Sequence, residues 1–538
     1  MLKKAYSISL QKAFKTIDWK LLILLVMFLN VQLVVKMAAL VLIYLLQFNF
    51  KFGFRFQHSR LPLFYPAAIG IGLFNGFVVF GFSNINYSFA LITGIGFWLV
   101  SILAIHQVKL SIEQNEPVVI HKTIQLFFIL NAAVSLSVYI IIVFKTGAVN
   151  PYLYQGEFQK YFIGTGDYIK GISFDTSTTN AVLNAFGIIY FLTRKNALMV
   201  MLCTVILLLT ASNITNLLLW FVLLWVFIFQ SDKVQKSLVL ICVLMGVIFM
   251  TKISPQNNKY MVSVYENIFN KNPLNDEATI NHLPIRESPD STLTTEERKQ
   301  KLATLYLDSL YRLQNKKQKM PGKAKIWEVI SIPTPNIHTP PFQRKSIISP
   351  YEENMLRFVN THHGDLPMSS DSNYQSIYPG KIIAWWQTLD YLQQHPSKII
   401  MGSGMGNFSS KLAFRTTGMK IAGGYPQKLK YMNADFVSNH LDLYLYYFTK
   451  ADGLHSLINS PNSVYNQLLS EYGLLGLLAF FIFYLGFFIR QIKKLTYGIP
   501  LLFLLSGIFF VDYWFEQLSM VVFFELLIFL NIKEEARS

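Results

Sequence analysis

Residues 21–50 read LLILLVMFLNVQLVVKMAALVLIYLLQFNF, an apolar run interrupted by Asn30, Gln32 and Lys36. A membrane helix needs about 20 apolar residues, so this run is too long for one ordinary span and can form two short ones. Similar runs recur along the chain, in which 52% of the 538 residues are hydrophobic and only 14% are charged. Soluble domains carry about 25% charged residues. The sequence therefore predicts an all-α polytopic membrane protein.

The charge distribution chooses between one and two helices over residues 21–50. With two, the apolar runs give about twelve spans, at roughly 21–35, 37–50, 61–82, 88–108, 126–144, 179–193, 197–211, 214–230, 237–251, 463–489, 497–511 and 515–532. The segments on the side of the N-terminus then hold 19 Lys and Arg, and the short loops on the other side hold three. Because cytoplasmic loops are enriched in Lys and Arg, both termini are predicted to be cytoplasmic. We interpret Lys36 as the break between the first two helices and Asp512 as a polar turn between the last two.

These spans divide the chain into three parts. An N-terminal membrane bundle of about nine helices occupies residues 1–251, an external loop domain occupies 252–462, and about three membrane helices occupy 463–538. The external part holds 24 Lys and Arg against 17 Asp and Glu. Basic residues on an outer face meet lipid headgroups, pyrophosphates or glycans, so nucleic acid is not expected as a partner. His362 and His363 lack a clear third ligand, and no metal site is expected.

A glycine-rich stretch lies in the second half of the external part. Residues 379–386 read PGKIIAWW, and residues 402–408 read GSGMGNF. Closely spaced glycines let backbone amides approach a ligand, and such loops cradle phosphates. A tight turn without a ligand is the alternative interpretation.

A polar stripe leads into the tenth predicted span. Residues 460–476 read SPNSVYNQLLSEYGLLG, and on a helix Ser463, Gln467 and Glu471 share one face. Polar groups near the end of a membrane helix are costly unless they are paired, which makes the stripe a candidate site. A hydrogen-bonded seam between helices explains it equally well.

Taken in order, these patterns resemble the O-antigen ligase and polymerase family. The sequences FDTSTTNA at 174–181 and LTAS at 209–212 continue the resemblance, which covers about residues 170–530. The resemblance implies a GT-C-like fold in the bacterial inner membrane, with a large periplasmic loop between helices 9 and 10. It also implies an inverting, metal-independent glycosyltransferase that needs no cofactor and takes its glycan from undecaprenyl pyrophosphate. Ligases of this family pass the glycan to lipid A core, polymerases pass it to another lipid-linked repeat, and relatives pass it to Ser or Thr of proteins.

Such a reaction needs cations against the pyrophosphate and a base near the acceptor hydroxyl. The expected catalytic residues are Glu471, His455 and Asn462, and His440 is an alternative candidate for the base. The expected substrate-binding residues are Lys381, Arg415, Gly404, Gly406, Asn407, Asn180, Ser463 and Gln467. Lys381 and Asn462 stand where the family commonly has Arg and His. Lysine keeps the charge without the bidentate fork, and asparagine can orient a hydroxyl but cannot take its proton.

Two classes of function are compatible with these sequence features, a transferase and a transporter. The leading hypothesis is ligation of O-antigen to lipid A core in lipopolysaccharide biosynthesis, with an O-antigen or exopolysaccharide polymerase or a protein O-oligosaccharyltransferase as the alternatives. The rival class is a polytopic transporter or flippase, which often shows two similar halves with binding groups at mid-membrane. Residues 1–251 show no repeat of the rest, and the polar residues concentrate in one external segment. The sequence therefore favours a transferase.

Overall fold

The computed structural model describes residues 16–80, 84–153, 165–255, 350–362, 378–421, 428–449 and 456–536, with the isolated positions 301–302, 305, 364, 366–367 and 425–426. Every regular element in this part of the chain is a helix. Four stretches are long and apolar enough to cross a membrane, namely Ile85–Gln114, Pro117–Thr146, Lys233–Ile253 and Leu457–Ile489, and shorter apolar helices accompany them. The chain is thus an all-helical protein with helices suited to a membrane, as its composition predicts.

The apolar runs of the sequence become two groups of helices. The first group is α2 (Trp19–Phe28), α3 (Leu33–Leu46), α4 (Phe64–Asn75), α5 (Ile85–Gln114), α6 (Pro117–Thr146), α7 (Ser177–Thr193), α8 (Ala197–Leu209), α9 (Asn213–Phe229) and α10 (Lys233–Ile248). The second group is α20 (Val464–Ala479), the π-helical turn η9 (Phe480–Leu485), α21 (Gly486–Ile489), α22 (Gly498–Ile508), α23 (Trp514–Gln517) and α24 (Ser519–Glu535).

The run at residues 21–50 forms two helices, but the break is not at Lys36. Helix α2 ends at Phe28, and the side chain of Asn30 accepts a hydrogen bond from the backbone N–H of Gln32 in the turn. Lys36 lies in the first turn of α3 and donates from Nζ to the carbonyl of Phe28, 2.7 Å away. A cation stabilises the C-terminal end of a helix, so Lys36 joins the two helices where we expected it to separate them.

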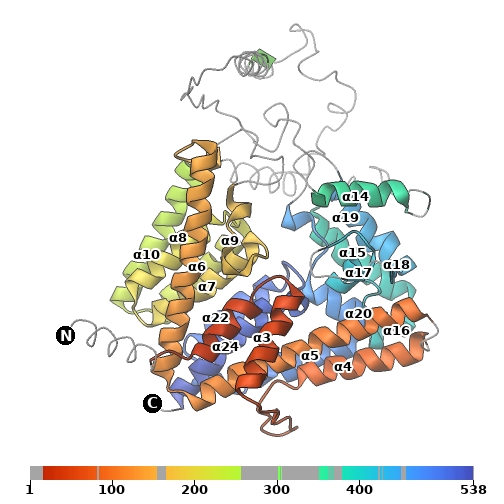
Figure 1. Ribbon diagram of the computed structural model, residues 1–538, viewed down its shortest axis with the longest axis horizontal. Helices are drawn as coiled ribbons and strands as arrows, with labels where there is room; N and C mark the ends of the chain where they lie inside the picture. The colour runs from red at the N-terminus through yellow and green to blue at the C-terminus, as the bar shows by residue number, and fades with distance from the viewer. Residues whose placement is uncertain are drawn as a thin grey trace.

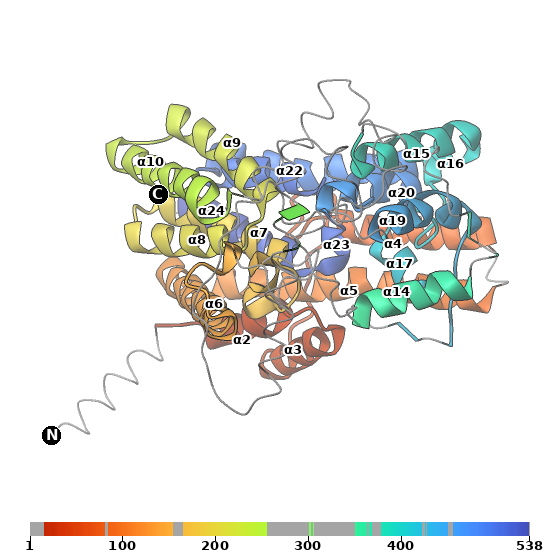
Figure 2. The same ribbon diagram turned by 90° about the horizontal axis from the view of Figure 1, so that it is seen from above.

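One hydrophobic core joins the helices of residues 1–251 to those of residues 463–538. Helix α24 is buried on all sides from Ser519 to Asn531, and α7 is buried from Ser177 to Leu192, so these two helices form the centre of the bundle. Peripheral helices turn large apolar side chains outward, a surface suited to lipid. The two membrane parts named from the sequence therefore share one bundle (Figures 1 and 2).

A smaller group of helices lies at one end of the bundle (Figure 1). It comprises α14 (Pro350–Thr361), α15 (Gly380–Gln394), α16 (Pro396–Met401), α17 (Lys411–Thr416), α18 (Ala434–Phe436) and α19 (Asp442–Phe448). A second core, which includes Phe358, Phe414 and Phe436, holds several of these helices together. Tyr431 packs against Tyr87, near the start of α5, with ring centres 5.2 Å apart. Most of the predicted loop domain between 252 and 377 lies outside the described residues.

Loops with basic residues meet at the opposite end of the bundle. Arg60, which precedes α4, pairs with Glu113 near the end of α5 at 2.7 Å. Arg194, which follows α7, pairs with Glu534 of α24 at 2.5 Å. Since α5 is 30 residues long, at about 1.5 Å per residue it separates the two ends by about 45 Å.

Candidate functional site

The glycine-rich loop at residues 402–408 wraps around the carboxylate of Glu471. Glu471 Oε2 accepts the backbone N–H of Gly406 at 2.8 Å, and Oε1 accepts those of Phe408 and Ser409 at 3.1 Å each. The N–H of Gly404 donates to the backbone carbonyl of Glu471 at 3.0 Å. Glu471 is almost fully buried. This carboxylate therefore anchors the loop from the neighbouring helix.

This geometry corrects the predicted roles of the loop and of Glu471. Amides that already hold a carboxylate are not available to a pyrophosphate, so Gly404 and Gly406 do not form the expected cradle in this conformation. Asn407 is also engaged, because its Nδ2 donates to Ser403 O at 2.7 Å and its Oδ1 accepts from Tyr431 OH at 2.8 Å. A carboxylate that accepts three N–H groups away from solvent is a poor general base for an incoming hydroxyl. The alternative interpretation, a tight turn, describes the loop.

Two glycines allow the loop and helix α20 to meet backbone to backbone. Gly402 has φ +78°, Gly473 has φ +66°, and a Cβ at Gly473 would overlap Ile400 O. Gly473→Ala is expected to destabilise the protein by about 3 kcal/mol, because it adds both left-handed strain and overlap. The thermal unfolding midpoint of the purified protein in detergent measures this change. Gly96→Ala is the matched control, since a Cβ there meets nothing within 4 Å, and an equal midpoint for both variants would contradict the prediction.

The polar stripe is a seam between helices, which was the alternative interpretation. Ser463 Oγ donates to Phe509 O at 3.3 Å, and Gln467 Nε2 donates to Glu516 Oε1 at 2.7 Å. Ser463 and Gln467 therefore connect α20 to the segment between α22 and α24. Both side chains were expected to bind substrate, but in this structure they bond to the protein itself.

Lys381 also bonds to the protein itself. Its ammonium donates to the carbonyls of Asn462 at 2.6 Å, Val511 at 2.9 Å and Ser460 at 3.2 Å. An ammonium has three donors, so these carbonyls use all of them and leave none for a pyrophosphate. Burial lowers the pKa of Lys381 to about 7, and the carboxylate of Asp512 opposes this fall. In this structure Lys381 joins helix α15 to the loops that flank α20 and α22.

The other predicted acid–base candidates do not assemble into a site. Asn462 donates from Nδ2 to Asp512 Oδ1 at 3.2 Å, which confirms Asp512 as part of a polar turn. His440 is fully buried and lies against Ala384 O at 3.0 Å, and burial lowers its pKa to about 4. His455 and His363 lie outside the described residues.

Asn180 belongs to a buried polar network at the start of α7. Its Nδ2 donates to Ile169 O at 2.9 Å and Ser135 Oγ at 3.1 Å, and its Oδ1 accepts from Asn131 at 2.8 Å and Asn184 at 2.9 Å. These four bonds satisfy the amide completely. The expected contact between Asn180 and substrate is therefore corrected to a structural role that fixes the segment ahead of α7.

Two cations of α17, Lys411 and Arg415, lie near Lys36, which comes from a distant part of the sequence. Arg415 is 5% exposed and lies over the ring of Phe97, 4.8 Å from its centre. Lys36, at 4% exposed, interacts electrostatically first with the carboxylate of Asp175 and then with Lys411 and Arg415. Like charges held together away from water repel one another, so this arrangement is suited to a bound anion. Two basic side chains, Lys381 and Arg415, were expected to bind the pyrophosphate. Arg415 belongs to this cluster, and Lys381 does not.

Carboxylates surround the same cations. Burial lowers the pKa of Arg415, and the charges of Glu516, Asp175 and Asp512 oppose this fall. Glu516 is buried, and its Oε2 accepts the backbone N–H of Leu412 at 2.7 Å, which orients the start of α17. Asp175 is only half-buried, and its Oδ2 accepts from Thr179 Oγ1 at 3.1 Å. These carboxylates offset part of the positive charge of the cluster, and Asp175 stays partly accessible beside the cations.

No known family model, curated protein or solved structure matches the chain. The assignment of the site therefore rests on its geometry and on the ordered sequence motifs. Within the part of the chain that the structure describes, no three His, Cys, Asp or Glu side chains group to hold a metal ion.

The sequence patterns missed most of this cluster. Lys36 carried a signal, a charge inside an apolar run, but it was interpreted as a helix break. Lys411 lies four residues before Arg415, so helical spacing predicts that both project from one face of α17. Glu516 follows a polar turn at the start of the last predicted span, where a buried carboxylate requires a partner.

Proposed function

We propose that the chain is a glycosyltransferase that moves a glycan from undecaprenyl pyrophosphate to an acceptor hydroxyl. The observation that carries this proposal is the group of three cations formed by the buried Lys36 and Arg415 and the half-buried Lys411. A pyrophosphate that leaves from a sugar develops negative charge, and preorganised cations in a water-poor site stabilise that charge strongly. The ordered motifs add the family resemblance.

The reaction proposed is a single displacement with inversion. The acceptor oxygen forms a bond to the anomeric carbon while the bond from that carbon to the pyrophosphate oxygen breaks, and the electron pair leaves with the pyrophosphate. Arg415, Lys411 and Lys36 neutralise the leaving group. Asp175 keeps solvent exposure beside them, so we assign it to accept the proton of the acceptor hydroxyl. Glu471 and Lys381 hold the surrounding loops in place.

We propose an inner-membrane protein with about twelve spans and both termini in the cytoplasm. The ion pairs Arg60–Glu113 and Arg194–Glu534 support this topology, because they join predicted cytoplasmic segments at one end of the bundle. The cation cluster and α14–α19 lie near the other end, which is periplasmic in this proposal. A lipid-linked donor then reaches the cluster from the outer leaflet.

O-antigen ligation to lipid A core is the reaction we favour, as the sequence resemblance does. The test uses the full-length protein in nanodiscs with undecaprenyl-pyrophosphate-linked repeat units, with and without lipid A core, and resolves the products by mass. Transfer to the core is the expected result. Longer lipid-linked chains without core would make the protein a polymerase, and transfer to added Ser- or Thr-containing protein would make it a protein oligosaccharyltransferase.

Measuring the movement of donor across a bilayer distinguishes a transferase from a flippase. If sound donor crosses the bilayer of proteoliposomes without any new glycosidic bond, the protein is a flippase and the proposal is wrong. If glycan is transferred while donor stays on its original side, transport is excluded as the activity.

A further inference from the structure

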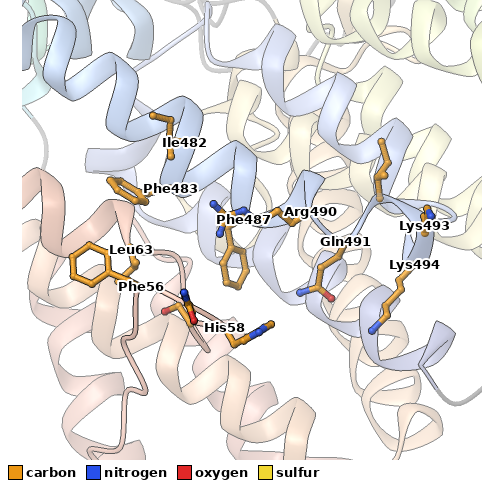
Figure 3. A pocket seen from close by; sticks show the side chains of 13 residues that line it. Phe56, His58, Leu63, Ile482, Phe483, Phe487, Arg490, Gln491, Lys493 and Lys494 are labelled. Atoms are coloured by element: carbon orange, nitrogen blue, oxygen red, sulfur yellow. The ribbon is translucent and has the colours of Figure 1, made fainter.

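A pocket lies at the end of the bundle where Arg60 pairs with Glu113. It has a volume of about 750 Å³ and lies between the segment ahead of α4 and the chain that runs from η9 through α21 to η10 (Ile492–Lys494). Figure 3 shows side chains from both segments facing the same space. Its lining residues are Phe56, Gln57, His58, Ser59, Leu63, Ile482, Phe483, Phe487, Arg490, Gln491, Ile492, Lys493 and Lys494. None of these takes part in the proposed transfer.

One side of this pocket is strongly basic. Arg490, Lys493 and Lys494 line it together with His58, and the lining contains no carboxylate. Elsewhere at this end, Arg60 and Arg194 are paired with Glu113 and Glu534. Among the described residues, no ion pair to the three basic side chains is found. The pocket thus presents three positive charges that form no ion pair with any carboxylate in the described part of the chain.

The other side of the pocket is apolar and open. Phe483 and Phe487 form its wall beside Ile482, which is 49% exposed, and Phe56 is 86% exposed at its edge. Ile482 lies on a helix of the membrane bundle, so its exposed face meets acyl chains in a bilayer. A free phosphate or nucleotide has no hydrocarbon chain that could pack against such an apolar wall. A molecule with an anionic head and a hydrocarbon tail matches both sides.

We propose that this pocket binds a glycerophospholipid with an anionic headgroup, with its phosphate at Arg490, Lys493 and Lys494 and an acyl chain along Phe483 and Phe487. Basic pockets between membrane helices on the cytoplasmic side bind such headgroups. The proposal does not depend on the transfer reaction. Bound lipid at this end of α20–α21 holds the loop ahead of α4 against the helix that carries Glu471 at its other end.

The test measures lipid binding directly. Full-length protein in detergent is titrated with mixed micelles of phosphatidylglycerol or phosphatidylcholine with the same acyl chains, and retained lipid is counted by native mass spectrometry. Wild-type protein is expected to retain phosphatidylglycerol preferentially. The triple variant Arg490→Gln, Lys493→Gln and Lys494→Gln is expected to bind it about 100-fold more weakly, since each basic residue strengthens binding about 5-fold.

A matched control removes the same charge outside the pocket. The triple variant Lys51→Gln, Arg55→Gln and Lys233→Gln alters exposed side chains at the same end of the bundle and is expected to bind like wild type. Equal losses in the two triple variants would mean that only general surface charge attracts the lipid. Such a result would overturn the proposal.

Two further arms distinguish a lipid from a free phosphate. Phe56→Ser is expected to weaken phosphatidylglycerol binding by about 10-fold through lost apolar contact, and it does not disturb the core because the ring is exposed. A large excess of inorganic phosphate is expected to leave the lipid bound. Full displacement by phosphate, or no preference for phosphatidylglycerol over phosphatidylcholine, would contradict a lipid site.

Discussion

Replacement of Glu471 with alanine is expected to remove most folded protein, even with no substrate present. Three buried N–H groups, from Gly406, Phe408 and Ser409, would lose their acceptor. Each unsatisfied buried donor costs about 1–3 kcal/mol, so we expect a loss of about 4 kcal/mol or more. The yield of monodisperse protein in detergent and its thermal unfolding midpoint measure this effect.

Glu471→Gln separates a structural role from a catalytic one. The amide keeps one oxygen for the loop but turns an NH₂ group toward a remaining N–H, so a partial loss of stability is expected, with turnover of the surviving protein within about 10-fold of wild type. A general base would behave in the opposite way, with turnover about 1,000-fold lower and an unchanged unfolding midpoint. Glu353→Gln is the control, because Glu353 lies in an exposed ion pair with Arg357 and its loss is expected to have little effect.

The all-helical architecture, with helices suited to a membrane, was predictable from the composition and the apolar runs of the sequence. The length of the apolar run at residues 21–50, together with the distribution of Lys and Arg along the chain, predicted two helices there. The position of the break was not predictable, since it depends on the local bond between Asn30 and Gln32 and on a lysine that reaches back to Phe28. A charged side chain inside an apolar run indicates that this side chain needs a polar partner, but it does not identify the partner.

The sequence located the glycine-rich loop and the polar stripe, but it did not reveal what these side chains contact. Glycines and a glutamate in one family pattern suggested a phosphate cradle and a base, but the glutamate occupies the cradle. Gly406 and Glu471 are 65 residues apart, and Gln467 and Glu516 are 49 apart. The first pair meets because α20 packs against α16 and the loop that follows it, and the second because α20 lies beside α23.

The candidate site was the least predictable part. Lys36 and Arg415 come from opposite ends of the sequence, and neither lies in a pattern with the other. Their proximity depends on how α3 and α17 both pack beside α5, which hydropathy does not specify. For this reason the sequence proposes Arg415 from chemistry alone, and it indicates Lys36 only as a break between two helices.

Replacement of Arg415 with alanine is expected to lower glycan transfer by about 100-fold while the protein stays folded. In the proposed reaction Arg415 supplies a charge against the leaving pyrophosphate, and one lost donor at a developing anion costs about 3 kcal/mol of transition-state stabilisation. Arg415→Lys keeps the charge without the planar fork, so a loss of only about 10-fold is expected. Initial rates with undecaprenyl-pyrophosphate-linked glycan measure both variants.

Two controls make this result specific to the site. Lys428→Ala removes an exposed cation from the same group of helices and is expected to leave the rate unchanged. Lys381→Met removes the cation that the family resemblance pointed to, and it is expected to lower the unfolding midpoint because three carbonyls lose their donor. If folded Arg415→Ala protein transfers glycan at the wild-type rate while folded Lys381→Met protein does not, the pyrophosphate lies at Lys381. The bonds that hold Lys381 to the protein would then have to open when the donor binds.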